Sequence, residues 1–330
     1  MQYTRREFGK LAAGTLPAAV LLDPFVAFAQ ARKPNSVING VKIGTITYSY
    51  RSMPDQSAEA TLRYILESGI SQIELMGGPP ESFAGSPQAG RGPGGGGGGG
   101  ARGGGGQPPT PEQQAAQREA GERLKKWRTT VSMDRFKALR KMYNDTGVTI
   151  YAWKVLEPNM SDEEFEYVFN VAEALGCTHT TLELPTDAAQ LKRIGDFALK
   201  KKIYAAYHTH TQATMTSFDQ AFAISKGNMS NIDLGHYVAG TGESPIPFLR
   251  KYHDRISSVH LKDRKTPARG ADNVPWGTGD TPITDILQLM RKEKYTFPAS
   301  IEMEYPVPEG SDAVKEVAKC LEFCRSALTT

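Results

Sequence analysis

The sequence predicts a (β/α)8 TIM barrel, a fold in which eight parallel strands alternate with helices. Eight short runs of apolar and β-branched residues follow one another from Val41 onward, as expected of parallel strands that are buried on both faces. The segments between them carry apolar residues every three or four positions, which is the spacing of amphipathic helices. A doubly wound open sheet is the alternative, but no Gly-x-Gly-x-x-Gly motif follows the first strand.

The strands are expected, in chain order, at Val41–Thr47, Gln72–Met76, Val148–Lys154, Thr180–Leu184, Ile203–His208, Asn231–Leu234, Ser257–Leu261 and Ala299–Met303. The clearest helices are expected where apolar side chains gather on one side, at Ser57–Ser68, Asp162–Leu175 and Ile283–Lys292. Gly69 and Gly176 follow the first two of these helices, and glycine is a common helix stop. A longer helical region is expected from Glu112 to Tyr143.

The first residues carry the pattern of a bacterial export signal. Arg5-Arg6 precedes a moderately apolar run from Leu11 to Leu22, and small residues suited to cleavage follow between Ala27 and Ala31. This order resembles a twin-arginine signal peptide, and an amphipathic leader or anchor is the alternative. The apolar run is shorter than the roughly 20 residues that span a bilayer. We therefore expect residues 1–31 to be removed and residues 32–330 to form one domain in the periplasm or outside the cell, without membrane contact.

Glycine is concentrated in one segment of the chain. Of the 33 glycines, 14 lie between Gly85 and Gly106, including the seven of Gly94–Gly100. Such a run has no side chains to bury, so it cannot offset the entropy lost when its backbone is ordered. Residues 85–111 are therefore expected to be a flexible, disordered insertion after strand two. The run lacks the Gly-Lys-Ser/Thr ending of a phosphate-binding loop.

Composition excludes several classes of protein. The 330 residues include 39 Lys and Arg against 36 Asp and Glu, a net charge of +3, and 39% are hydrophobic. This balance provides a core and excludes both a disordered chain and a highly charged nucleic-acid-binding tail. Three cysteines are too few for a disulfide scaffold; Cys320 and Cys324 are expected to pack on one helix face, and Cys177 to be a small buried hydrophobe.

Polar side chains end five of the later strands, and a barrel builds its site where the strands end. These tails hold four of the six histidines and five carboxylates, in Thr180-Thr-Leu-Glu183-Leu, Tyr207-His208-Thr-His210, Asn231-Ile-Asp233-Leu-Gly-His236, His260-Leu-Lys-Asp263 and Ser300-Ile-Glu302-Met-Glu304. Because each tail belongs to a different strand, the side chains can converge. A mixed imidazole and carboxylate cluster suits Mn, Zn, Co or a related divalent ion. His179, before its strand, and His253, in a helical stretch, are expected to be structural or surface residues.

Four motifs stand out in this part of the chain: Asp233-Leu-Gly-His236, His260-Leu-Lys-Asp263, Trp276-Gly-Thr-Gly-Asp280 and Ser300-Ile-Glu302-Met-Glu304. Together they resemble the xylose isomerase-like TIM barrel superfamily, in its sugar phosphate isomerase/epimerase branch. That branch includes ketose 3-epimerases, hydroxypyruvate isomerase and inosose dehydratase. The resemblance covers the chain from about Val41 to the C-terminus and is strongest after about Tyr204.

The resemblance implies one divalent metal ion, Mn, Zn, Co or Mg, at the ends of the late strands. Asp233, His260 and Glu302 match three of the family's ligands. The remaining family ligand is a glutamate at the end of strand five, where this chain has His208. Glu183, one strand earlier, could supply the missing carboxylate, so either His208 or Glu183 is expected to complete the metal site.

The resemblance also implies residues that contact the substrate. His236 matches the family's substrate-contacting histidine, and the family's arginine has two nearby candidates, Arg264 and Arg269. Two side chains have an alternative interpretation. Lys154 could be a surface lysine, and Trp276 could be a core residue rather than part of a loop that closes over the sugar. The substrate-binding residues are expected to be His210, His236, Lys154, Asp263 and Trp276.

The implied chemistry is metal-assisted proton transfer, in which the metal holds two oxygens of a hydroxy-ketone or hydroxy-aldehyde and stabilises an enediolate. Glu302, with Glu183 or His208, would move protons on and off carbon as the catalytic residues. The resemblance thus implies a metal-dependent sugar isomerase or epimerase with a small carbohydrate substrate. Sugar phosphates are scarce outside the cytoplasm, so a free or oxidised sugar is expected.

Other functions stay open at this stage. Enediolate chemistry beside a leaving group gives β-elimination, so a keto-glycoside lyase or hydratase could use the same site. The histidine at position 208 also suits a sugar-binding protein that has lost catalysis. A nuclease, known elsewhere in the superfamily, is disfavoured because a net charge of +3 shows no concentrated basic stripe, and no nucleic acid is expected as a partner. A homo-oligomer stays open.

Overall fold

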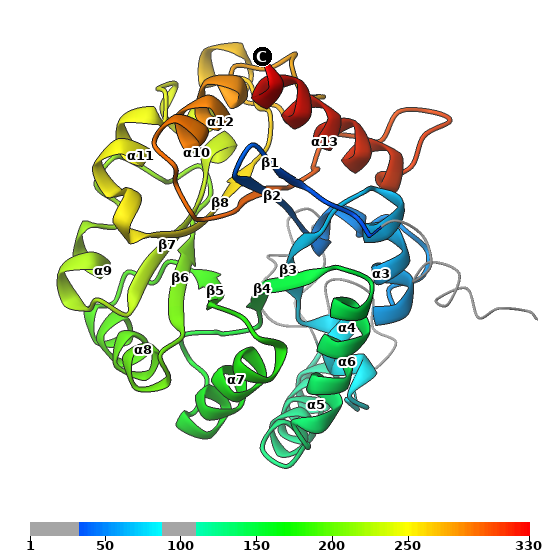
Figure 1. Ribbon diagram of the computed structural model, residues 1–330. Helices are drawn as coiled ribbons and strands as arrows, with labels where there is room; N and C mark the ends of the chain where they lie inside the picture. Colours follow the sequence, from blue (N-terminus) through cyan, green and yellow to red (C-terminus); the bar gives the residue numbers. More distant parts are fainter. Residues whose placement is uncertain (1–32, 88–109) are drawn as a thin grey trace, which may run out of the picture. The chain divides into compact units, whose positions relative to one another are not determined.

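Strands β2 to β9 form a closed parallel barrel in the computed structural model, which describes residues 33–87 and 110–330 (Figure 1). Neighbouring strands pair in chain order, and β2 also pairs with β9, which closes the ring. The strands are β2 Val41–Ile46, β3 Gln72–Met76, β4 Thr149–Lys154, β5 His179–Glu183, β6 Tyr204–His208, β7 Asn228–Asp233, β8 Ile256–Leu261 and β9 Ala299–Ile301. The predicted barrel is therefore confirmed, and the alternative of an open sheet is wrong.

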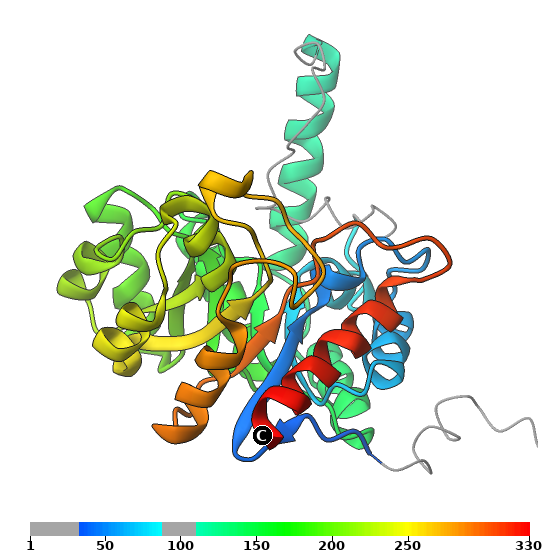
Figure 2. The same cartoon turned by 90° about the horizontal axis from the view of Figure 1, so that it is seen from above.

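Helices surround the barrel of the unit Pro34–Thr330 (Figures 1 and 2). Among these α-helices are α3 Ala58–Glu67, α4 Gly78–Phe83, α6 Asp134–Asp145, α7 Asp162–Leu175, α8 Ala188–Lys201, α9 Asp219–Ile224, α10 Leu234–Thr241, α11 Ile246–Tyr252, α12 Ile283–Lys292 and α13 Ala313–Thr329. Three short 3-10 helices are η1 Thr47–Tyr50, η2 His253–Arg255 and η3 Pro267–Arg269. The helices expected at α3, α7 and α12 are confirmed, and α7 ends at Gly176 with a φ of 78°.

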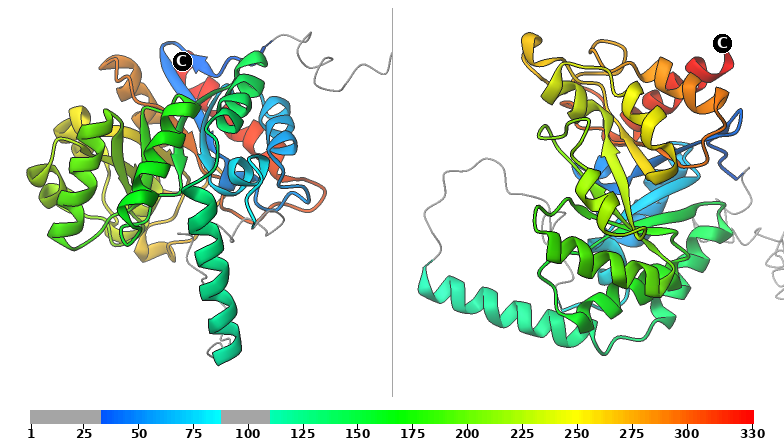
Figure 3. Two further views of the ribbon diagram at one scale, coloured as in Figure 1. Left: turned by 90° about the horizontal axis from the view of Figure 1, so that it is seen from below. Right: turned by 90° about the vertical axis from the view of Figure 1, so that its left-hand side faces the viewer.

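The helical region expected from Glu112 to Tyr143 is two helices, α5 Pro111–Arg128 and α6. The hydroxyls of Thr129 and Thr130 donate to the carbonyl of Lys126 at 3.0 and 2.9 Å, and such local bonds compete with the helical ladder. The N-terminal part of α5 is exposed, and Figures 2 and 3 show this helix standing out from the barrel.

A short hairpin precedes the barrel, which the periodicity did not predict. β1 Val37–Ile38 pairs antiparallel with β2 across a two-residue turn. Asn39 and Gly40, with φ of 48° and 86°, form this turn, and an Asn-Gly pair is the usual sequence for a turn that needs two positive φ angles.

The inside of the barrel is lined by polar side chains that bond to one another. Ser258 accepts from Asn231 Nδ2 at 2.5 Å and lies 2.9 Å from His179 Nε2. All three side chains are fully buried. His179 therefore has the structural role expected of it, although it begins β5 rather than preceding it, while His253 lies exposed in η2.

Further predictions concern the three cysteines, membrane-spanning helices, the N-terminal signal and the glycine-rich insertion. Cys177, Cys320 and Cys324 are free and buried, as predicted. Among the helices that the structure describes, none combines the length and apolar character needed to cross a bilayer. The predicted signal, residues 1–31, and positions 88–109 of the predicted glycine-rich insertion lie outside the described residues.

Candidate metal centre

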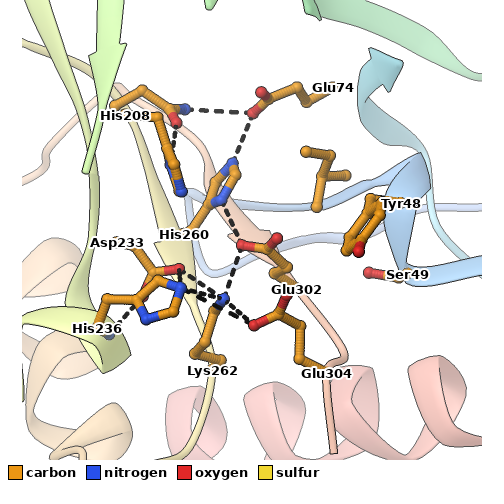
Figure 4. A network of polar contacts seen from close by, with 12 residues as sticks. Tyr48, Ser49, Glu74, His208, Asp233, His236, His260, Lys262, Glu302 and Glu304 are labelled. Carbon is orange, nitrogen blue, oxygen red and sulfur yellow. Dashed lines mark hydrogen bonds and ion pairs between the residues drawn. The ribbon is translucent and has the colours of Figure 1, made fainter. Parts of the chain in front are cut away.

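Four potential metal ligands meet at the carboxyl ends of four successive strands (Figure 4). His208 ends β6, Asp233 ends β7, His260 is the second-last residue of β8, and Glu302 directly follows β9. Each offers one ligand atom, these atoms lie within 4.8 Å of one another, and all four residues are buried. Parallel strands end on the same rim of a barrel, which is why residues spread over about a hundred positions converge. We call these four residues the ligand set.

Glu183, the other expected ligand, lies apart from this set. Its Oε1 is 3.1 Å from Lys154 Nζ, and its Oε2 is 3.5 Å from His210 Nε2. Its side chain is 40% exposed, whereas that of Asp233 is fully buried. The structure therefore brings His208, and not Glu183, to the other three predicted ligands.

His260 stands between two carboxylates. Its Nδ1 is 2.7 Å from Glu302 Oε2, and its Nε2 is 2.8 Å from Glu74 Oε2. Burial alone would lower the pKa of His260, but the two carboxylates outweigh it and raise the pKa to about 10. Burial also opposes the charge on Glu74, yet His260 and the Thr181 hydroxyl hold the pKa of Glu74 at about 2.

Glu74 was missed in the sequence, although a signal for it was present. It is a carboxylate in the middle of the predicted strand Gln72–Met76, and that strand is buried at its three central positions. A charged residue inside a strand that is covered on both faces needs a buried partner, because an unpaired buried carboxylate is costly. His260 and Asn231 supply that partner, with Asn231 Nδ2 donating to Glu74 at 3.2 Å.

His208 is held as a neutral imidazole. Burial and the charge of Lys154 keep its pKa well below the ordinary range. Its Nδ1 lies 3.2 Å from Asn231 Oδ1, and the Asn231 amide donates to Glu74, so Asn231 accepts and His208 Nδ1 carries the proton. Nε2 of His208 is then the nitrogen that can bind a cation, and Asn231 fixes this tautomer.

Asp233 has one oxygen that accepts a hydrogen bond and one that is engaged only by an ion pair. Its Oδ1 caps helix α10 by accepting from the backbone N–H of His236 at 2.7 Å. Its Oδ2 is buried and accepts no hydrogen bond of good geometry from any described residue, although Lys262 Nζ lies 3.0 Å away. Burial raises the pKa of Asp233 against the opposing charge of Lys262. A buried carboxylate oxygen that is held by an ion pair and accepts no hydrogen bond suits a bound cation.

Lys262 is a second residue without a predicted role. It follows β8 by one residue, and its side chain is only 2% exposed. Its Nζ lies 2.5 Å from Glu304 Oε2, 3.0 Å from Asp233 Oδ2 and 3.1 Å from Glu302 Oε2 (Figure 4). These carboxylates raise its pKa although burial opposes its charge. A positive charge is therefore already stabilised beside the ligand set.

The ligand set fits a divalent cation. Two imidazoles and two carboxylates are a donor set typical of Zn, Mn or Co. A second group of ring nitrogens, from His208, His210 and His236, also lies within 4.8 Å. However, His236 faces a cation at both nitrogens, with Lys262 Nζ 3.1 Å from Nε2 and Arg264 bonded to Nδ1. That group contains no carboxylate to offset these charges, whereas the ligand set contains two, so the ligand set is the better site.

The predicted substrate-binding residues divide into two groups. His236, His210 and Lys154 surround the ligand set: the rings of His210 and His236 stack at 4.9 Å, and Lys154 pairs with Glu183 beside them. Asp263 has another role, because Oδ2 accepts from the backbone N–H groups of Gly277, Thr278 and Gly279, and Oδ1 accepts from that of Thr281. Trp276, in the loop that Asp263 holds, packs edge-to-face on Phe323 of α13.

Fold and site together define a (β/α)8-barrel protein with a histidine–carboxylate centre where its strands end. The chain belongs to the xylose isomerase-like TIM barrel family, whose model matches residues 117–325. This family includes isomerases, epimerases and dehydratases.

Individual relatives are more distant. The chain is similar to the inosose dehydratase of Clostridium botulinum (strain Eklund 17B / Type B), with 29% identity over 135 residues, or 34% of this chain and 45% of that protein. The match therefore spans less than half the length of this curated relative.

Solved structures share the fold over most of the chain. A sugar phosphate isomerase/epimerase from Parabacteroides distasonis has 16% identity and a TM-score of 0.57, covering 88% of this chain and 96% of that one. A D-allulose 3-epimerase from Methylomonas sp., in complex with D-allulose, has 14% identity and a TM-score of 0.53, covering 90% and 98%. At such identities the likeness shows the fold alone.

Proposed function

We propose that this protein is a divalent-metal-dependent isomerase or epimerase that moves protons at the carbon beside the carbonyl of a free or oxidised sugar. The observation that carries the proposal is the buried ligand set, His208, Asp233, His260 and Glu302, on the catalytic rim of the barrel. The carbohydrate-related names of the family's members support a small sugar as the substrate.

The residues around the ligand set would have different roles in the reaction. A bound divalent cation would supply a Lewis acid that polarises the carbonyl of the substrate. Burial opposes the charge of Glu302 and Glu183, but neighbouring cations keep the pKa of each below its ordinary value, so both are ionised and can accept a proton. His210, whose ring stacks on that of His236 beside them, presents a ring nitrogen for a sugar hydroxyl.

Elimination of water or an alcohol is the second candidate function. Epimerisation at one carbon takes a base on each face, whereas elimination takes one base and an acid for the leaving group. The ligand set holds His208 at one of its four positions, and Glu302 is its one carboxylate not used to cap a helix. The match to a protein named inosose dehydratase supports this candidate as well.

The predicted twin-arginine signal bears on the substrate. We propose that the chain is exported, so that its substrate is a sugar, an oxidised sugar or a glycoside available outside the cytoplasm. Fusion of residues 1–40 to a reporter in a bacterium with and without its twin-arginine translocase tests this. Export that does not depend on the translocase would contradict the proposal.

The decisive experiment is isotope exchange. The Mn²⁺-loaded protein is incubated in D2O with a panel of ketoses and keto-glycosides, and the products are read by NMR. We expect deuterium at the carbon beside the carbonyl, and Glu302→Gln should abolish the exchange while keeping the fold. Release of water or an aglycone would select elimination. The absence of both, with sugars that bind, would leave a sugar-binding protein without catalysis.

A further inference from the structure

We propose that Lys262 is a built-in cation that competes with the divalent metal for Asp233 and Glu302, and so sets how tightly the site holds metal. The inference rests on the proposed metal centre, and it assigns to Lys262 a role that the ligands themselves do not reveal.

The position of the ammonium group carries the proposal. Lys262 Nζ lies 3.0 Å from Asp233 Oδ2 and 3.1 Å from Glu302 Oε2, two of the four members of the ligand set. The Glu302 oxygen involved is the same Oε2 that bonds His260 Nδ1, so the ammonium shares an oxygen with the centre of the set. Lys262 thus contacts two carboxylates that would also be ligands of a bound metal (Figure 4).

Two cations cannot both occupy these contacts. An ammonium group and a divalent ion that contact the same carboxylate oxygens lie within a few ångströms of each other and repel. The Asp233 and Glu302 side chains are 0% and 7% exposed, so little water is present to screen the repulsion. Metal binding therefore has to displace the ammonium from at least these two oxygens.

The structure provides a place for the displaced ammonium. Glu304 Oε2 is its nearest contact, at 2.5 Å, and Glu304 is outside the ligand set. The Glu304 side chain is 20% exposed, so the lysine can shift toward it and toward solvent without losing its strongest partner. Lys262 alternates between two arrangements: shared among three carboxylates, or paired with Glu304 alone.

The contact between Lys262 and His236 destabilises the arrangement in which the ammonium is shared among three carboxylates. Lys262 Nζ also lies 3.1 Å from His236 Nε2, while Arg264 bonds Nδ1 of the same ring. A neutral imidazole has one acceptor nitrogen, so it cannot accept from both cations. Moving the ammonium toward Glu304 relieves this conflict and lowers the cost of its displacement.

The test is the metal affinity of the metal-stripped full chain, measured by titration with MnCl2 at one pH and followed by the EPR signal of free Mn²⁺. Lys262→Met should bind Mn²⁺ at least about tenfold more tightly than the wild type, because the competing charge is gone. Lys265→Met is the control: it removes another lysine a few residues along the chain, one that pairs with Asp272 and not with the ligand set. It should change the affinity less than about threefold.

Substitution of Glu304 gives an independent test, in which the affinity for Mn²⁺ should change in the opposite direction. Glu304→Gln should weaken Mn²⁺ binding, because the ammonium loses its alternative partner, and it should do so by at least about threefold more than Glu183→Gln. In the Lys262→Met background the effect of Glu304→Gln should vanish, since the two residues act as one unit. If Lys262→Met does not fold, the comparison of Glu304→Gln with Glu183→Gln decides alone.

The outcomes separate this inference from the metal centre. Stoichiometric Mn²⁺ binding to the wild type, with an unchanged or weaker affinity in Lys262→Met, would overturn the inference and leave the centre standing. An equal gain in Lys265→Met would also overturn it, because the effect would then come from the loss of any positive charge. No Mn²⁺ binding by either the wild type or Lys262→Met would overturn the metal centre, and the competition with it.

Discussion

Nε2 of His260 lies 2.8 Å from Oε2 of Glu74, and both side chains are fully buried inside the barrel. This contact leaves Nδ1 of His260 as the nitrogen that faces Glu302 at 2.7 Å. A carboxylate behind a metal-binding histidine fixes the ring and raises its basicity. Glu74 is thus the residue that orients His260 within the ligand set.

Glu74→Gln should lower the affinity for Mn²⁺ by about 10- to 100-fold, because the amide orients His260 without a negative charge. Titration of the metal-stripped protein measures this. Thr181→Val is the control: it removes the 2.7 Å bond to the other oxygen of Glu74 and leaves the His260 contact in place. An equal loss in both variants would mean that Glu74 supports the barrel rather than His260.

The metal-free protein should lose stability in mild alkali. The pKa of His260 is raised from the ordinary 6.5 to about 10, so its contribution is complete below pH 6.5 and is lost as the pH rises toward 10. The pKa of Glu74 is lowered from 4.5 to about 2, so the same contact is lost again as the pH falls from 4.5 toward 2. Urea unfolding in EDTA at several pH values measures both slopes.

The predicted loss of stability in alkali has its own control. His260→Asn should flatten the decline between pH 6.5 and 10, because the group that loses its proton is gone. In the wild type, the affinity for metal should increase over the same interval, since a metal must displace the proton of His260. A decline in stability that persists unchanged in His260→Asn would contradict the assignment.

His208 and Glu183 can be distinguished by substitution. His208→Ala should weaken Mn²⁺ binding at least about tenfold, because it removes one of the four ligand atoms. Glu183→Ala should weaken it far less, because Glu183 is engaged with Lys154 and His210 outside the set. The reverse order of affinities would make Glu183 the fourth ligand.

Arg128 anchors the C-terminal end of α5. Its Nε lies 2.8 Å from Glu81 Oε1, the two side chains are 5% and 7% exposed, and Tyr167 donates to the same carboxylate at 3.0 Å. Arg128→Met should lower the free energy of unfolding by about 3 kcal/mol, because the buried carboxylate of Glu81 loses the cation that neutralises it. Arg123→Met, on the same helix but with an exposed pair to Glu119, should cost about 0.5 kcal/mol or less. Denaturant unfolding of both variants makes the comparison.

Asp263 should act on its loop rather than on the substrate. Its carboxylate accepts from Gly277, Gly279 and Thr281, so Asp263→Ala leaves these N–H groups without their partner and should make the loop 264–281 more sensitive to protease. Asp285→Ala, at an exposed position of α12, is the control and should leave the cleavage rate unchanged. Unaltered cleavage in Asp263→Ala with a raised KM would restore the original expectation of substrate binding.

The local pattern of apolar residues was sufficient to predict most of the strands and helices. The strand at 72–76 and the helices at 162–175 and 283–292 have the predicted bounds, because hydrophobic periodicity is a property of neighbouring residues. The break between α5 and α6 was missed, since it depends on hydroxyl bonds at Thr129 and Thr130 that no apolar period records.

The sequence by itself determined the barrel and, through the strand-end rule, placed Asp233, His260 and Glu302 at one rim. Only the tertiary structure decided the rest: that His208 and not Glu183 joins them, that Glu74 stands behind His260 from 186 residues away, and that Lys262 lies among the carboxylates. The physical reason is that strand order tells which residues share a rim, whereas contacts within a few ångströms depend on side-chain direction and on the register of strands far apart in the chain.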